Sequence, residues 1–279
     1  MTNSQRLLKL ESQAIKLISS AAVAGDPIEV AYSGGKDSDV LLHLVRKSGV
    51  DYRAIYKNTT IDPPKTLLHV REMGAEIRQP TNTFRQLIEK KGWPSRFVRF
   101  CCSELKEYPI LPRILMGVRK AEGNARNDRY QEPSRCLVYG SKSRTVDAFY
   151  PLLFWKNEDI AAYIEREKIK CHPLYYDADG AFHVERRLGC MCCPLAYYKT
   201  RIEEFKKYPN MVKLYVKAGE KYRTSHPHVE FTKRYDNIYD AFTRYLFFER
   251  DRDFEFAVRG FFGKVDCKKF LEDYFKITF

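Results

Sequence analysis

The 279-residue sequence has no uninterrupted apolar run of the roughly 18 residues that a membrane-spanning helix needs, and residues 1–16 contain no secretory-type apolar segment. It also has no internal repeat and no low-complexity segment. The four-residue spacer of the Walker phosphate loop and the spacing of the dinucleotide fingerprint are both missing. These absences predict a cytoplasmic protein without a membrane partner, and they exclude two common nucleotide-binding signatures.

The composition is that of a folded, basic protein. Apolar residues make up 44% of the chain, which is enough for one sizeable core plus a smaller appended unit. The 49 Lys and Arg residues exceed the 36 Asp and Glu residues, so the formal net charge is +13. This charge favours an anionic partner such as a nucleotide or a nucleic acid, although a basic solvated surface without a partner has the same composition.

Short β-rich runs alternate with helical periodicity over most of the chain, which indicates parallel strands joined by helices. We predict strands at 28–32, 52–56, 76–78, 114–118, 136–139 and 149–153, and helices at 7–23, 39–47, after Pro63-Pro64, at 84–91 and at 159–167, the last capped by Asn157. Residues 120–135 have few apolar side chains and are predicted to form a surface loop.

The chain changes character after Pro194, where Tyr, Phe, Lys and Arg recur at helical rather than alternating spacing. The predicted fold is therefore α/β, with a Rossmann-like, mostly parallel sheet, helices on both faces and a helical C-terminal region. We predict two domains, a nucleotide-binding domain at 1–196 that includes the cysteine groups and a basic-aromatic helical region at 197–279.

The segment Ser33-Gly34-Gly35-Lys36-Asp37-Ser38 follows a predicted buried strand and begins a predicted helix. Small residues at 33–35 let backbone N–H groups and the helix N-terminus approach an anion. We therefore predict that Ser33, Gly34, Gly35 and Ser38 hold phosphate, that Lys36 adds a cation, and that Asp37 caps the helix or holds a metal ion. The alternative is an ordinary glycine-rich turn from strand to helix.

The order Ser-Gly-Gly-x-Asp-Ser resembles the PP-loop of the adenine nucleotide alpha hydrolases, and further segments resemble the phosphoadenosine phosphosulfate reductase branch of that superfamily. Asn58-Thr59-Thr60 is similar to that family's nucleotide-contacting segment, and Gly117-Val118-Arg119 with Glu122 and Arg126 to its arginine signature, with Gly123 in place of Ser. The resemblance implies nucleotide contacts by Asn58, Thr59 and Arg126 and a catalytic role for Arg119. Further landmarks of the family resemble Pro151-Leu152, Trp155 and Pro173-Leu174-Tyr175, with His172 in place of Asn. We assign His172 no role and expect it to be a packed loop histidine.

One departure from the family concerns its nucleophile. Its reductases carry a cysteine in a C-terminal Glu-Cys-Gly-Ile/Leu-His motif, which this sequence does not contain. Cys267 has no following His and lies on a predicted helix, so a buried helical thiol is the favoured interpretation, although nearby lysines could lower its pKa.

Cysteines occur in two tight groups, Cys101-Cys102 and Cys190-x-Cys192-Cys193. The pattern resembles the cluster-bearing adenylyl sulfate reductases and the DNA phosphorothioation enzymes, which implies that Cys101, Cys102, Cys190 and Cys193 hold one [4Fe-4S] cluster with Cys192 as a spare thiol. A zinc ion could bind the same four thiolates, and buried or disulfide-linked cysteines are further alternatives.

The leading functional hypothesis is an enzyme that uses ATP or a related adenylate, with Mg²⁺ positioned by Asp37, to activate an acceptor for sulfur transfer with release of AMP and pyrophosphate. Lys36 and Arg119 would steady the developing negative charge. Possible partners are an adenine nucleotide, a nucleic-acid acceptor and a sulfur-donor protein. The alternatives are a sulfonucleotide reductase that takes its thiol from Cys267 or from another protein, and a nucleic-acid-binding or nucleotide-sensing module that uses the aromatic C-terminal region.

Overall fold

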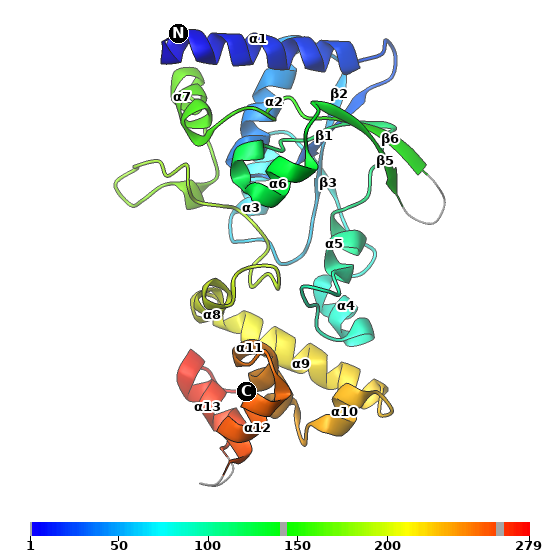
Figure 1. Cartoon of the computed structure of the whole chain (residues 1–279), viewed down its shortest axis with the longest axis vertical. Coiled ribbons are helices and arrows are strands. Elements are labelled where there is room, and N and C mark those ends of the chain that lie inside the picture. The colour runs from blue at the N-terminus through cyan, green and yellow to red at the C-terminus, as the bar shows by residue number, and fades with distance from the viewer. Residues whose placement is uncertain (1, 140–143, 261–264) are drawn as a thin grey trace. The chain divides into compact units, whose positions relative to one another are not determined.

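The structure, a computed structural model, describes residues 2–139, 144–260 and 265–279, without the side chains at 124–126, 138–139, 144 and 231–232. The chain divides into two compact units (Figure 1). The first unit comprises residues 1–58, 62–79 and 106–189, and the second comprises residues 59–61, 80–105 and 190–279.

The first unit contains a six-stranded sheet in the order β3-β2-β1-β4-β6-β5. Its strands are β1 (Ile28–Tyr32), β2 (Tyr52–Lys57), β3 (Glu76–Arg78), β4 (Arg113–Leu115), β5 (Ser134–Tyr139) and β6 (Arg144–Phe149). All neighbouring pairs are parallel except β5 and β6, which form an antiparallel pair at one edge (Figure 1). Because the strand order reverses at β1, with β2 on one side and β4 on the other, the carboxyl end of β1 lies at a topological switch point, where α/β sheets bind ligands.

The helices of the first unit are α1 (Asn3–Ala21), α2 (Lys36–Ser48), α3 (Thr66–Glu72), α6 (Asn124–Arg129) and α7 (Asn157–Glu167), with single 3₁₀ turns η1 (Lys120–Glu122) and η2 (Pro173–Tyr175). α2 packs against β1, α1 and α7, and its apolar residues from Val40 to Val45 are buried in the core with Ile28 and Val30 of β1. This packing fixes the start of α2 at the carboxyl end of the central strand.

The predicted α/β fold class, with a mostly parallel sheet, is confirmed, whereas several element boundaries were wrong. Residues 149–153 do not form a strand, because β6 ends at Phe149 and the chain turns through Pro151. Residues 120–135 are not a continuous loop, since they form η1, α6 and the start of β5. Lys156 rather than Asn157 is the N-cap of α7, and its backbone N–H donates to the Asp159 carboxylate at 2.8 Å.

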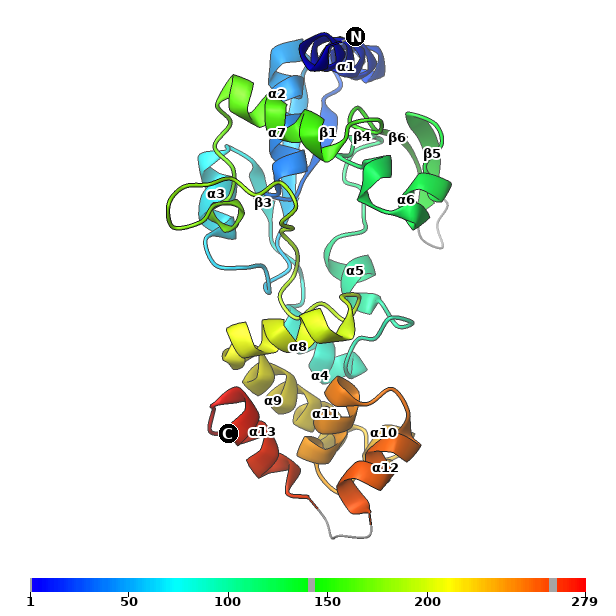
Figure 2. The ribbon, with the colours of Figure 1, turned by 60° about the vertical axis from the view of Figure 1, so that its left-hand side comes forward.

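The described part of the second unit consists of helices and the loops that join them, without a strand (Figure 2). Its helices are α4 (Phe84–Lys91), α5 (Phe100–Leu105), α8 (Tyr198–Lys207), α9 (Pro209–Ser225), α10 (Glu230–Arg234), α11 (Ile238–Phe247), α12 (Asp251–Arg259) and α13 (Cys267–Phe275). α4 packs along α9, and the Trp93 ring lies so close to α9 that a Cβ at Gly219 would be 2.6 Å from it. The helical prediction for the C-terminal region is therefore confirmed.

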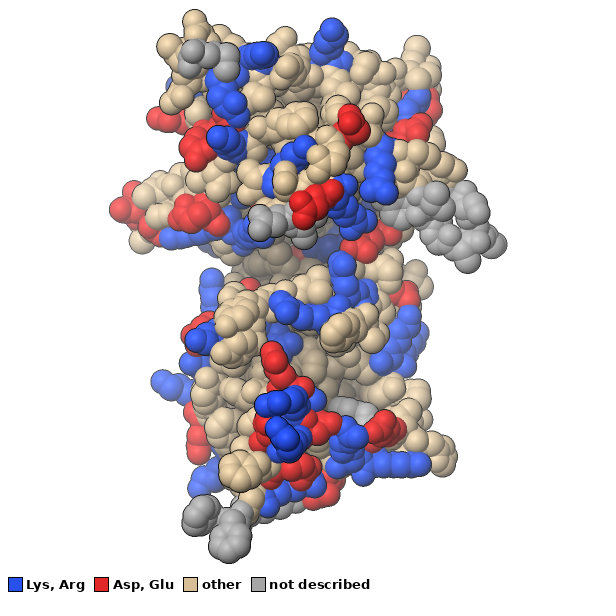
Figure 3. Space-filling model, viewed as in Figure 1, with Lys and Arg blue, Asp and Glu red and all other residues tan. Residues whose placement is uncertain are grey.

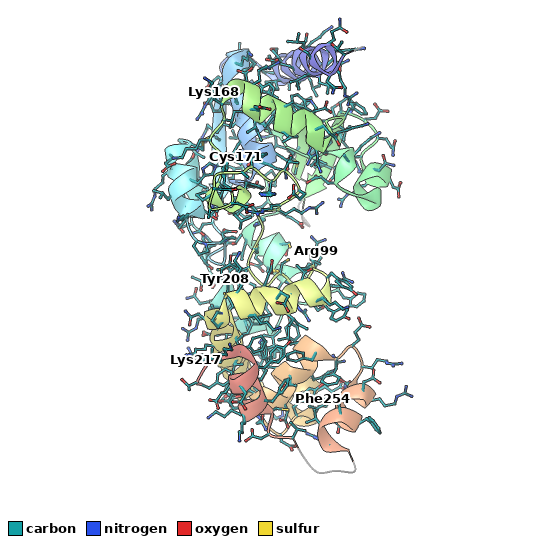
Figure 4. The ribbon with its side chains drawn as sticks, turned by 90° about the vertical axis from the view of Figure 1, so that its left-hand side faces the viewer. Arg99, Lys168, Cys171, Tyr208, Lys217 and Phe254 are labelled. Atoms are coloured by element: carbon teal, nitrogen blue, oxygen red, sulfur yellow. The ribbon has the colours of Figure 1, made fainter. Side chains whose placement is uncertain are left out.

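Many of the aromatic residues of the C-terminal region form a core, whereas Phe256 is 83% exposed. Phe205, Tyr215, Phe242 and Phe254 are fully buried, and the ring centroids of Phe205 and Tyr215 are 5.2 Å apart. Figure 4 marks Phe254 on α12, within this helical unit. This packing agrees with the interpretation of the stretch as an aromatic core rather than a set of exposed stacking platforms.

The compact units group the chain differently from the predicted domain boundary at 196/197. The segments that carry the paired cysteines belong to the second unit, together with the C-terminal helices. Basic and acidic side chains are interspersed over the face shown in Figure 3, with basic ones in excess. Within the described residues, no helix is both long enough and apolar enough to cross a membrane.

Candidate functional site: a phosphate loop and a group of cysteines

The loop between β1 and α2 is held in a tight turn by its own side chains. Gly34 has φ +74°, a left-handed conformation that an L side chain rarely adopts. The Ser33 backbone N–H and hydroxyl both donate to Ser38 Oγ, at 3.2 and 3.1 Å, and Ser38 Oγ donates to the Gly35 carbonyl at 2.7 Å. The two serines therefore fix the loop's shape.

Backbone N–H groups converge at this turn. The Asp39 N–H donates to the Gly35 carbonyl and begins the helical hydrogen bonds of α2. The N–H groups of Gly34, Asp37 and Ser38 have no acceptor in the described part of the chain. Unpaired amides at the positive end of a helix dipole can bind an anion, and phosphate is one anion that such a glycine-rich turn can bind.

Lys36 and Asp37 lie side by side at this site. The Lys36 ammonium is buried, 3.2 Å from Asp37 Oδ2 and 3.4 Å from the Arg186 carbonyl oxygen. The Lys36 N–H donates to the Tyr175 hydroxyl at 3.2 Å, and the ammonium lies 5.3 Å from the centre of the Tyr175 ring. A cation is thus held at the start of α2, where charge on a bound anion would be neutralised.

Arg119 is buried beside the loop, with 2% of its surface exposed. Its Nε lies 2.7 Å from Asp37 Oδ1 without the alignment of a hydrogen bond, and its Nη1 donates to Asn157 Oδ1 at 3.1 Å. Gly117 permits this approach, since a Cβ there would lie 3.3 Å from the Asp37 carbonyl oxygen. The Gly-x-Arg pattern therefore positions Arg119 against Asp37.

A buried polar network that the sequence analysis missed lies directly behind the loop. The Asp39 carboxylate oxygens are 3.0 and 3.1 Å from His69 Nε2, and the Tyr32 hydroxyl donates to Asp39 Oδ1 at 2.5 Å. Burial raises the pKa of Asp39, and burial also raises the pKa of the Cys171 thiol, which lies beside Asp39 in the segment after α7 (Figure 4). The sequence signal for this network was Asp39, an acidic residue within the apolar face of α2.

His172 is packed, as expected. Its Nδ1 accepts the Leu174 N–H at 3.0 Å and its Nε2 lies 3.3 Å from Thr66 Oγ1, so both ring nitrogens have partners. Burial lowers the pKa of His172 to about 4. The ring therefore stays neutral near pH 7 and supports the turn η2.

The remaining residues predicted to contact a nucleotide lie outside the Ser33–Ser38 loop. Asn58 follows β2, is buried, and donates to Gln79 Oε1 at 2.8 Å. Thr59 belongs to the second unit, where its hydroxyl oxygen lies 3.8 Å from Cys190 Sγ. Arg126 lies in α6, but its side chain is outside the described residues. Nucleotide contacts by these three residues stay predictions.

The paired cysteines all belong to the second unit. A hydrogen bond with Cys102 raises the pKa of Cys101, with burial and the neighbouring thiols of Cys190 and Cys193 acting in the same direction. All eight cysteines are within the described residues and none forms a disulfide, which excludes that alternative for this structure. Among the described residues, no three His, Cys, Asp or Glu side chains are arranged to hold a metal ion.

The turn that carries Cys190 and Cys193 is anchored by Glu204, which the sequence analysis also missed. The Glu204 carboxylate accepts the Cys192 N–H at 2.8 Å, and Cys192 adopts φ +55°. The Cys192 side chain is fully buried, and burial raises the pKa of its thiol. Cys267 is also buried, and burial raises its pKa to about 11, as expected for a helical thiol that is not a nucleophile.

Comparison with known proteins supplies a family. The model of the phosphoadenosine phosphosulfate reductase domain matches residues 27–196. The chain is 26% identical over 229 residues to the uncharacterized protein MJ0973 of Methanocaldococcus jannaschii, which covers 77% of this chain and 54% of that protein. It is 27% identical over 207 residues to sulfate adenylyltransferase subunit 2 of Nocardia farcinica, which covers 62% of this chain and 66% of that protein.

Among solved structures, phosphoadenylyl-sulfate reductase from Candida auris in its phosphate complex overlaps with a TM-score of 0.44 at 18% identity, over 65% of this chain and 96% of that chain. The chain spans only about half to two thirds of the length of the two relatives described above. The family match nevertheless covers more than half of this chain and includes both the Ser33–Ser38 loop and Gly117–Arg119. The chain belongs to the phosphoadenosine phosphosulfate reductase domain family.

Proposed function

We propose that this protein binds ATP with its phosphates on the Ser33–Ser38 loop and transfers the adenylyl group to an acceptor oxygen, as the activating step of a sulfur-transfer reaction. The observation that carries the proposal is the set of backbone N–H groups without acceptors at Gly34, Asp37 and Ser38, beside the Lys36 ammonium. Donors and a cation preorganised at one turn stabilise negative charge on a phosphate group.

In this reaction the acceptor oxygen attacks the α-phosphorus of ATP, and the bond from the α-phosphorus to the bridging oxygen breaks. The acceptor becomes an adenylate and pyrophosphate leaves with the bonding electrons. The free amides of the loop bind the departing pyrophosphate, and Lys36 neutralises part of its charge. If sulfur then replaces the activated oxygen, AMP is the second product.

Arg119 and Asp37 have a positioning role in this proposal. Arg119 binds Asp37 and Asn157, and Asp37 binds Lys36, so Arg119 and Asp37 together hold the Lys36 ammonium in place. Asp37 Oδ2 lies 3.2 Å from Lys36 Nζ, and Asp37 Oδ1 lies 2.7 Å from Arg119 Nε without a hydrogen bond. We therefore assign Asp37 to the orientation of Lys36, and Mg²⁺ binding by Asp37 stays a prediction.

The relatives support adenylyl transfer. Several of the similar curated proteins, from Nocardia farcinica to Shewanella frigidimarina, are named sulfate adenylyltransferase subunit 2, at 26–27% identity in these two cases. An oxyanion such as sulfate is thus one candidate acceptor class, and a nucleic-acid acceptor is another that the chain's positive charge favours.

The cysteine group fits an iron–sulfur cluster in its donor chemistry. Cys101, Cys102, Cys190 and Cys193 supply the four thiolates that such clusters use, from two segments of one unit, although no three of them are arranged to hold a metal ion in the described residues. These four residues would hold a [4Fe-4S] cluster, which supplies electron-transfer chemistry when bound. Zinc would use the same residues.

A sulfonucleotide reductase is the second candidate, favoured by the family match itself. The burial of Cys267 disfavours it as the missing nucleophile, because a buried thiol with a raised pKa is a weak one. Such a reductase would therefore need a thiol from another protein.

Product analysis separates the candidates. Anaerobically prepared protein is incubated with ATP, with adenylyl sulfate or with its 3′-phosphorylated form, in the presence of sulfate, RNA or DNA as acceptor. We expect pyrophosphate and an adenylate or AMP from ATP, and no sulfite from either sulfonucleotide. Sulfite formation with thioredoxin as the only thiol source would favour the reductase, and binding without any product would favour a nucleotide sensor.

A further inference from the structure

The Tyr175 hydroxyl lies against the phosphate loop in a fixed position. The turn η2 carries Tyr175, whose backbone N–H donates to the His172 carbonyl at 3.0 Å, and only 2% of the residue's surface is exposed. A Cβ built at Gly35 would lie 3.2 Å from the hydroxyl oxygen. The hydroxyl therefore faces the part of the loop where the chain has no side chain.

This hydroxyl accepts two hydrogen bonds and donates none within the described residues. The oxygen accepts the Lys36 N–H at 3.2 Å and the Leu188 N–H at 3.3 Å. A phenolic oxygen that accepts two bonds still has one O–H to donate, and no acceptor for it lies within the described residues. Burial raises the pKa of Tyr175, so the proton is retained near pH 7. A buried donor without a protein acceptor is unfavourable, and an acceptor on a bound ligand would satisfy it.

We propose that the Tyr175 O–H donates to a phosphate oxygen of the bound nucleotide and is a further phosphate-binding residue of this protein. The inference rests on the proposed nucleotide site, because the neighbouring amides of Gly34, Asp37 and Ser38 define where the phosphate lies. The two N–H bonds orient the O–H toward that phosphate, while the ring packs under the Lys36 ammonium.

The variant Tyr175→Phe tests this, because it removes the hydroxyl and keeps the ring against Lys36. The matched control is Tyr176→Phe, which removes a hydroxyl that accepts the Cys171 N–H at 3.3 Å. Isothermal titration calorimetry measures the binding of ATP, pyrophosphate and adenosine. We expect Tyr175→Phe to weaken ATP and pyrophosphate binding by about tenfold or more, as for a lost hydrogen bond to a charged group, with adenosine binding unchanged. Tyr176→Phe should match the wild type.

Several results would overturn the assignment. Equal ATP and pyrophosphate affinities in the wild type and in Tyr175→Phe would do so, and so would equal losses for ATP and adenosine, which indicate a structural role. A wild-type protein that binds neither ATP nor pyrophosphate would refute the nucleotide site and this inference together. If Tyr175→Phe does not fold, 3-fluorotyrosine at position 175 keeps the hydroxyl, and its ¹⁹F resonance is expected to move on addition of pyrophosphate. An unchanged resonance at saturating pyrophosphate would count against the contact.

Discussion

The buried ion pair of Arg119 and Asp37 is expected to hold the first turn of α2 in place. The substitution Arg119→Met keeps much of the aliphatic stem and removes the contacts of the guanidinium. These contacts are with Asp37 Oδ1 at 2.7 Å, Asn157 Oδ1 at 3.1 Å and the Trp155 carbonyl at 3.5 Å. Because 2% of Arg119 is exposed, water cannot replace them.

The size of the destabilisation depends on the Asp37 charge, which stays in the protein after its arginine partner is removed. Removing one partner of a buried ion pair costs about 3–5 kcal/mol, since the other charge loses its compensation. Asp37 keeps the Lys36 ammonium at 3.2 Å and 17% of its side-chain surface is exposed, so the lower end of that range applies. We therefore expect a loss of about 3 kcal/mol in the free energy of unfolding, which corresponds to a Tm lower by roughly 6–12 °C for a unit of this size.

The chain offers a convenient reporter for this measurement. It has two tryptophans, Trp155 in the first unit and Trp93 in the second. In a Trp93→Phe background, fluorescence therefore follows the unfolding of the first unit alone. The control Arg6→Met removes an ion pair with Asp159 in which the arginine side chain is 35% exposed, and less than about 1 kcal/mol should be lost.

A double-mutant cycle with Asp37→Asn isolates the pair. We expect the two substitutions to be non-additive, with a coupling free energy of about 1–3 kcal/mol. The reasoning is refuted if the free energy of unfolding of Arg119→Met lies within about 0.5 kcal/mol of the wild-type value. It is also refuted if the free-energy losses of Arg119→Met and Asp37→Asn add within the same margin.

Three further predictions concern the same structure. Burial lowers the pKa of His172 to about 4 from its ordinary 6.5, so the unfolded chain binds a proton before the folded protein does, and stability present above pH 6.5 is lost as the pH falls toward 4. The variant His172→Asn keeps an acceptor for the Leu174 N–H and should lose less free energy of unfolding between pH 7 and 5, as measured by urea unfolding. Equal losses in the variant and the wild type would contradict this. Gly34→Ala should cost about 1–2 kcal/mol because φ is +74°, and an unchanged urea midpoint would argue against the strained turn. Cys193→Ser should lower the iron and sulfide content of anaerobically purified protein, whereas Cys136→Ser, at an exposed position on β5, should not; equal iron in both variants would exclude Cys193 as a ligand.

The sequence predicted the central part of the fold because local signals agree there. The apolar run 28–32, the glycines that follow it and the apolar periodicity of 39–47 are each short-range patterns, and β1 and α2 form where these patterns indicate. The sheet edge was predicted less well. Residues 149–153 are as apolar as a strand because they are buried, but they form a turn, and burial alone does not distinguish the two.

In the candidate site, too, local sequence patterns were predictable and long-range contacts were not. The candidate phosphate loop is contiguous in sequence, so its glycine-rich pattern is recognisable there, whereas Tyr175 is 139 residues from Lys36 and contacts it only through the fold. The pair Asp39 and His69 is likewise a long-range contact. The membership of the two cysteine segments in one unit with the C-terminal helices depends on the packing of α4 along α9, which no local pattern specifies.

Nucleotide binding at the Ser33–Ser38 loop is tested most directly by the affinity of ATP for two glycine variants. A side chain at Gly35 would enter the space that faces Tyr175, whereas a Cβ at Gly189 meets no atom within 4 Å. By isothermal titration calorimetry, we expect the wild type and Gly189→Val to bind ATP equally well and Gly35→Val to bind it at least about tenfold more weakly, a change of 1.4 kcal/mol. No ATP binding to the wild type, or equal binding to Gly35→Val, would contradict the assignment of this loop as the phosphate site.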